Sequence, residues 1–171
     1  MLPEKVNNLA PNKEDMRRHV EWLMRGMEDY KDGQIEIAYS EVNTGAINNA
    51  EKFTIDRPED VGHIVDFAHE MNAKGRNVYI VGSYLVPSAP LTGRSNDKQF
   101  YATNNIWCDI DDPITPVALK EKYKNLPPGL IVVTGRHPHI RAHLWWKLHE
   151  PITDAQEPVS YTHLRAHETK A

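Results

Sequence analysis

Cysteine is nearly absent from this sequence of 171 residues, which contains only Cys108. A single cysteine excludes an internal disulfide framework and favours a reducing compartment, so we expect a cytoplasmic protein. On a strand, Cys108 would share the apolar face of its neighbours Ile106 and Ile110. We therefore expect it to be a small buried hydrophobic side chain and not a nucleophile.

Long apolar runs are missing too, since no stretch approaches the roughly 18 to 20 residues of a membrane span. The start of the chain, Met1-Leu2-Pro3-Glu4-Lys5, lacks the basic beginning and apolar core of a secretory signal. Hydrophobic residues make up 40% and charged residues 26% of the chain, which is ordinary for a soluble globular protein. The length fits one domain. Because long apolar runs are missing, we expect no membrane contact.

An excess of positive charge is also lacking, because the formal net charge is −4. This balance excludes a protein that grips duplex DNA along a generally basic surface. Contacts with nucleic acid would have to come from a local patch. The densest candidate is 136–147, which carries Arg136, Arg141, Lys147 and three histidines but no acidic residue.

Hydrophobic periodicity and turn residues divide the chain into helices and strands. Helices are predicted at 13–30, 58–74 and 115–124. Strands are predicted at 34–42, 52–55, 77–86, 106–111, 130–134 and 141–148, the third of them buried on both faces. This order predicts an α+β fold, in which helices pack on a mixed, partly antiparallel sheet.

Three residues are expected to bound the helices. Asn12 is the predicted N-cap of the first helix, and Gly75 is predicted to end the second. Asp112 is predicted to cap the third.

Two of the predicted strands carry charged residues on one face. Side chains on a strand alternate between faces, so Asp109 and Asp111 share a face of 106–111 with Trp107. The polar face of 141–148 consists of Arg141, His143, Trp145 and Lys147. One strand offers carboxylates and the other offers cations and an imidazole, a combination that suits a divalent metal bound to a phosphate chain.

The carboxylate pair is the candidate metal site. Hard divalent cations take oxygen ligands, and Mg²⁺ uses one or two carboxylates together with substrate phosphates. Two metals about 3.5 to 4 Å apart can stabilise both the attacking and the leaving oxygen of a phosphoryl transfer. Asp109 and Asp111 are therefore candidate ligands for Mg²⁺ or Mn²⁺, with a solvated acidic strand end as the alternative.

The second strand offers contacts to phosphate and base. His143 beside Arg141 could donate hydrogen bonds to anionic oxygens, although a locally satisfied histidine fits the pattern too. Trp145 could stack on a base or pack inside the protein. His137 and His139 could hold a metal or lie in an exposed loop, and His139 could contact a phosphate. Further residues could line the same cleft: Arg94, Lys98, Asn104 and Asn105.

With these residues in place, the chain resembles the archaeo-eukaryotic primase superfamily, in particular plasmid and phage replication primases of RepB type. The resemblance covers about 22–151. It rests on the strand Trp107-Cys108-Asp109-Ile110-Asp111 and on Val132-Val133-Thr134-Gly135-Arg136 leading to Arg141-Ala142-His143-Leu144-Trp145-Trp146.

The resemblance implies a DNA primase or primase-polymerase of a phage, prophage or plasmid. Such a nucleotidyltransferase makes primers from nucleoside triphosphates on a single-stranded DNA template, uses two Mg²⁺ or Mn²⁺ ions, and can accompany a helicase domain or partner. Asp109 and Asp111 match the metal-binding carboxylates, and His143 matches the histidine that contacts the incoming nucleotide's phosphates. Expected nucleotide or phosphate contacts are Arg141, His139, Arg136 and Arg94.

Two departures from the family pattern matter. The turn between Thr134 and His143 is longer than the family's Ser/Thr-x-His spacing, so His139 is a rival for the histidine's role. The third motif, a hydrophobic residue followed by Asp, has no counterpart before Pro158. Residues 159–171 look like translated sequencing adapter, so we expect 1–12 to be a loose lead-in, 13–158 a partial catalytic domain and 159–171 a non-native tail. A fragment of this kind is expected to be inactive.

Two other functions remain open. A replication-initiator endonuclease would use His137 and His139 as metal ligands and a tyrosine such as Tyr123 as nucleophile. A non-catalytic DNA-binding replication module would keep the fold with a decayed site.

Overall fold

The computed structural model describes residues 11–42, 45–136 and 138–153. The predictions made for 1–10, His137 and 159–171 lie outside these residues. The helices are α1 (Lys13–Met24), α2 (Asp60–Ala73) and α3 (Pro116–Lys122), with short 3₁₀ helices at Glu28–Tyr30 and Asp97–Gln99. The strands are β1 (Gln34–Tyr39), β2 (Asn49–Thr54), β3 (Val78–Ile80), β4 (Tyr84–Leu85), β5 (Phe100–Ile110), β6 (Leu130–Gly135) and β7 (Arg141–Ile152).

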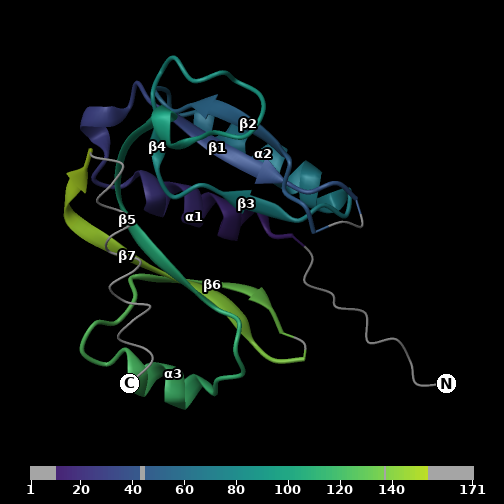
Figure 1. Cartoon of the computed structure of the whole chain (residues 1–171), viewed down its shortest axis with the longest axis vertical. Coiled ribbons are helices and arrows are strands. Elements are labelled where there is room, and N and C mark those ends of the chain that lie inside the picture. Colours follow the sequence, from purple (N-terminus) through teal and green to yellow (C-terminus); the bar gives the residue numbers. More distant parts are fainter. Residues whose placement is uncertain (1–10, 43–44, 137, 154–171) are drawn as a thin grey trace.

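The strands form one curled sheet in the order β2-β1-β4-β5-β7-β6, with β3 paired to β1. The predicted α+β class is confirmed, and every strand pair among the described residues is antiparallel. The long strand β5 joins the two parts of the sheet: it pairs with β4 at one end and with β7 along the other (Figure 1). Residues far apart in the chain are thereby brought onto one surface.

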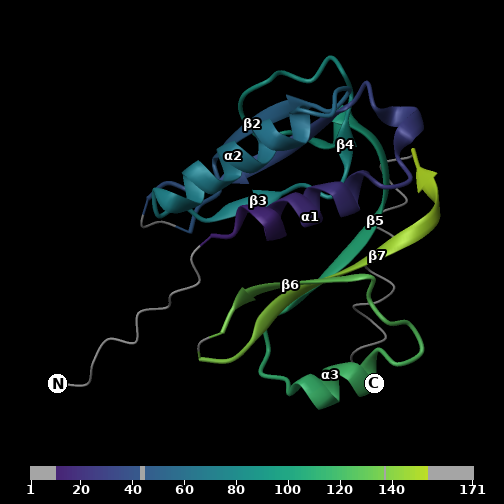
Figure 2. The same cartoon turned by 180° about the vertical axis from the view of Figure 1, so that it is seen from behind.

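The core lies between the β1 part of the sheet and the two longer helices. Ile35 and Ile37 alternate with Glu36 along β1, and both pack into a cluster with Val20 of α1 and Ile64 of α2. Figure 2 shows α1 and α2 side by side on this face of the sheet. Each helix packs its apolar stripe against the sheet. Because α1 is held in this way, it can contribute residues to the adjoining β5–β7 surface.

The strands predicted at 106–111 and 141–148 are longer in the structure, since β5 begins at Phe100 and β7 continues to Ile152, while β5 ends one residue before Asp111. Two other predicted elements differ more. The strand predicted at 77–86 is interrupted at 81–83, and Tyr79 within it is 38% exposed, so this segment is not buried on both faces. The helix predicted at 13–30 ends at Met24. Gly26 follows at φ +77°, a left-handed conformation that cannot continue a helix.

The predicted caps of the first two helices are confirmed. The side chain of Asn12 accepts hydrogen bonds from the backbone N–H groups of Glu14 and Asp15, and Gly75 follows α2 at φ +78°. The prediction for Asp112 is wrong, because Thr115 caps α3 by accepting a hydrogen bond from the N–H of Ala118. Thr115 lies directly before the first turn, where a side-chain oxygen reaches the orphan donors.

None of the helices in the described part of the chain is long and apolar enough to cross a membrane.

Candidate functional site

The pairing of β5 with β7 places Asp109 and His143 on one face, and Asp111 follows directly after the end of β5. Asp109 lies directly opposite His143 in the register, and Trp107 lies opposite Trp145. The Nε2 atom of His143 is 3.6 Å from Oδ1 of Asp109. Since both strands alternate with a period of two, this pairing brings together side chains from segments more than 30 residues apart.

Asp109 is held in an environment that disfavours its charge. Partial burial, followed by the nearby negative charge of Asp111, raises the pKa of Asp109, and the attraction of His143 offsets only part of this effect. The carboxyl groups of Asp109 and Asp111 are thus close enough to repel each other. A cation placed between them would relieve the repulsion.

The basic residues of the β6–β7 turn lie at the same end of the strands. His139 contacts the backbone carbonyl of Asp111 through Nε2. Arg141 lies opposite Gly135 in the register, and a Cβ built at that glycine would lie 2.6 Å from a guanidinium nitrogen of Arg141. The missing side chain therefore lets Arg141 pack over β6. Arg136 is exposed beside this pair.

Helix α1 adds a histidine that the sequence analysis left without a function. The His19 ring packs edge-on against Trp145 at 5.2 Å between centroids. Burial, followed by the positive charge of His143 when protonated, lowers the pKa of His19 to about 4. Its Nε2 atom is buried with no hydrogen-bond partner among the described residues, so His19 is held neutral. The signal in the sequence was its position beside Val20 on the apolar stripe.

The two tryptophans of this face have different environments. Trp145 is only 2% exposed, whereas Trp107 is 42% exposed. Of the two uses considered for Trp145, packing is the one the structure shows. The indole that a ligand could reach is that of Trp107, whose place on the carboxylate face was predicted but whose role was not.

Lys147 and the asparagines of β5 form hydrogen bonds with the C-terminal end of α1. Lys147 Nζ donates hydrogen bonds to the carbonyls of Leu23 and Arg25 and to Oδ1 of Asn104. Burial, with a smaller contribution from the charge of Arg25, lowers the pKa of Lys147 to about 8. Asn105 donates to the Leu23 carbonyl as well. These contacts satisfy the C-terminal carbonyls of the helix.

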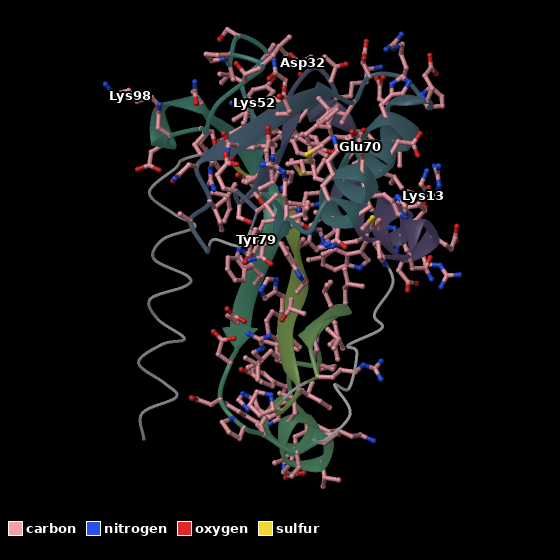
Figure 3. All side chains as sticks on the ribbon, turned by 90° about the vertical axis from the view of Figure 1, so that its right-hand side faces the viewer. Lys13, Asp32, Lys52, Glu70, Tyr79 and Lys98 are labelled. Carbon is pink, nitrogen blue, oxygen red and sulfur yellow. The ribbon has the colours of Figure 1, made fainter. Side chains whose placement is uncertain are left out.

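Arg94 is engaged elsewhere. Its Nε lies 2.9 Å from Oε1 of Glu36, a fully buried carboxylate on β1 that also accepts a hydrogen bond from the N–H of Ser95. Lys52 of β2, labelled in Figure 3, lies 3.7 Å from the same carboxylate. This cluster fastens the loop before β5 to the β1–β2 part of the sheet. None of the described contacts joins Arg94 to Asp109 or His143.

The opposite face of β5 carries no charge pair of this kind. Cys108 points to that face, as predicted, and its Sγ lies 3.6 Å from the hydroxyl of Tyr123. Tyr123 also packs on Trp146. The contacts described for Tyr123 are thus with the side chains of β5 and β7, and His137, which the endonuclease hypothesis also requires, lies outside the described residues.

Asp109, Asp111 and His143 make a donor set of two carboxylates and one imidazole. Among the described residues, no three His, Cys, Asp or Glu side chains gather closely enough to hold a metal ion. Two carboxylates nevertheless fit a hard cation whose other ligands are water and phosphate oxygens.

The protein is thus an α+β domain with a curled antiparallel sheet, and one face of this sheet carries carboxylates beside a histidine. No protein-family model matches the sequence, and no curated protein matches it. One solved structure is similar: the AEP domain of the primase-polymerase (PrimPol) of cyanophage S-2L, with a TM-score of 0.51 and 17% identity. The match covers 84% of this chain and 66% of that one, so the chain spans about two thirds of the length of the domain it resembles. At this identity the likeness concerns the fold.

Proposed function

We propose that this chain is part of a primase-polymerase catalytic domain, of the kind that phages, prophages and plasmids use in DNA replication. Its reaction would be metal-dependent nucleotidyl transfer, in which nucleoside triphosphates are joined into a primer on a single-stranded DNA template. The observation that carries the proposal is the register of β5 and β7, which pairs Asp109 with His143. The fold likeness to a primase-polymerase domain supports it.

In this proposal Asp109 and Asp111 hold Mg²⁺ or Mn²⁺. The bound metal would neutralise charge on the triphosphate and polarise the attacking hydroxyl. The raised pKa of Asp109 is consistent with this role, since a bound cation would offset the repulsion between the two carboxylates. His143 would donate a hydrogen bond to a phosphate oxygen from the same face.

The β6–β7 turn would complete the phosphate site. Arg141 and Arg136 would supply positive charge near the end of β5, and His139 remains a rival for the phosphate-contacting histidine. Arg94 forms an ion pair with Glu36, so we do not assign it to the nucleotide. Since no third carboxylate joins the pair among the described residues, turnover is expected to need a further ligand from outside them.

Binding, more than turnover, therefore tests the site as it stands. Free Mn²⁺ gives an electron paramagnetic resonance signal that is lost when the ion binds, so a titration without nucleotide measures the affinity for the metal. Equilibrium dialysis of a labelled nucleoside triphosphate, with and without Mn²⁺, measures the affinity for the nucleotide. We expect the triphosphate to bind only when Mn²⁺ is present and at least about tenfold more weakly to Asp109→Asn and Asp111→Asn. Asp97→Asn, an exposed aspartate outside this face, is the matched control.

Two results would contradict the proposal: no metal-dependent binding in the unmodified chain, or equal binding by the Asp109 and Asp111 variants. A DNA-binding module with a decayed site would bind DNA but would bind neither the nucleotide nor the metal.

A further inference from the structure

Trp107 is a large aromatic side chain left open to solvent beside the carboxylates. It is 42% exposed, and it precedes Asp109 by two residues, so both side chains project from the same face of β5. Two residues along a strand span about 6.5 to 7 Å. Other exposed apolar residues nearby, Ile131 and Val133, alternate to the opposite face, because they pair with Leu144 and Ala142.

The ring of Trp107 packs against the rings of two neighbouring residues. The Trp107 and Trp145 centroids are 5.8 Å apart with their planes tilted by only 30°, and the His143 ring lies 5.2 Å from Trp107. Together with His19 these rings form a continuous group, which we call the aromatic ledge: His19, Trp107, His143 and Trp145.

The ledge is fixed in position by the close approach of the chain at Gly82. A Cβ at this residue would lie 2.7 Å from Cζ3 of Trp145 and 3.8 Å from Cδ1 of Trp107. The segment between β3 and β4 thus presses on the tryptophans with no side chain between them. Since Trp145 is buried and Trp107 rests on it, the outer indole is already ordered before any ligand arrives, which lowers the entropic cost of stacking.

Resting on the proposed function, we propose that Trp107 stacks against the base of the nucleotide whose phosphates are bound through the metal at Asp109 and Asp111. A flat, pre-ordered indole two residues from a metal-binding carboxylate is placed where a ribose could bridge the two contacts. Stacking uses the π face that every base presents, so Trp107 would add affinity without selecting among the four bases.

The test compares a ligand that has a base with one that lacks it. Dissociation constants are measured in Mn²⁺ for a nucleoside triphosphate and for inorganic tripolyphosphate. We expect Trp107→Leu, which keeps apolar bulk without a π face, to weaken triphosphate binding by about tenfold and to leave tripolyphosphate binding unchanged. Trp107→Phe should stay within about threefold of the unmodified chain.

A matched control and a second readout separate this effect from misfolding. Tyr79 is an aromatic residue of similar exposure on β3, labelled in Figure 3, and Tyr79→Leu should change neither affinity. Triphosphate should also quench tryptophan fluorescence in the unmodified chain and lose most of that quenching in Trp107→Phe.

The outcomes distinguish the two proposals. If both ligands bind and Trp107→Leu weakens neither, or weakens both equally, stacking is refuted while the metal and phosphate site stands. If neither ligand binds to the unmodified chain, the proposed function fails and stacking fails with it.

Discussion

The half-buried His19, whose Nε2 atom is fully buried, predicts a specific dependence of stability on pH. Its pKa falls from 6.5 to about 4 on folding, so the unfolded chain binds the proton more tightly. The native state therefore loses stability as the pH falls from about 6.5 to 4. A shift of this size corresponds to about 3 kcal/mol in total, of which about 2 kcal/mol should be lost between pH 7.5 and pH 5.

The assay is urea denaturation at pH 7.5 and pH 5 of the unmodified chain and of His19→Phe. Phenylalanine keeps a ring against Trp145 but cannot titrate. Carboxylates also titrate in this range, so the relevant quantity is the difference between the two proteins in their loss of unfolding free energy. We expect His19→Phe to lose about 2 kcal/mol less.

The matched control is His149→Phe on β7, at an exposed histidine with no ion pair among the described contacts. This variant should show the same loss as the unmodified chain. If His19→Phe also loses as much as the unmodified chain, within about 0.5 kcal/mol, then the His19 ring is accessible to water and the packing described for the aromatic ledge is wrong.

Three further predictions follow from individual contacts. Asp109→Asn should leave the melting temperature in EDTA unchanged or slightly higher, because the raised pKa of Asp109 shows that its charge is disfavoured in the metal-free fold; a clear drop would contradict this. Gly82→Ala should destabilise the protein by about 1 to 3 kcal/mol in urea denaturation through overpacking against the indoles; Gly45→Ala, whose new Cβ would meet no atom of the described residues within 4 Å, should not. Glu36→Gln should cost about 3 kcal/mol by leaving the buried Lys52 ammonium without its counter-charge, and equal stability would show that water reaches this cluster.

Much of the local structure was predictable because it depends on short-range patterns. Alternation placed Asp109 and Asp111 on one face and Cys108 on the other, and apolar spacing identified α1 and α2. Asn12 and Gly75 were recognised as caps because their roles depend on the adjacent backbone alone. Gly26 adopts a left-handed conformation and ends α1 early. The prediction missed this end because the apolar spacing continues to Met27, beyond the glycine.

What surrounds each side chain was decided only by tertiary structure. The sequence placed Trp145 and Lys147 on the polar face with His143, and the register agrees, but α1 covers one and takes hydrogen bonds from the other. Arg94 is a loop residue whose partner, Glu36, lies 58 positions earlier, so no local pattern could reveal the pair. His19 and Trp107 are similar cases, because neither their exposure nor their neighbours follow from the local sequence pattern. Burial and pairing depend on which segments the sheet brings together, and that long-range arrangement determines which charges, rings and carboxylates share a surface.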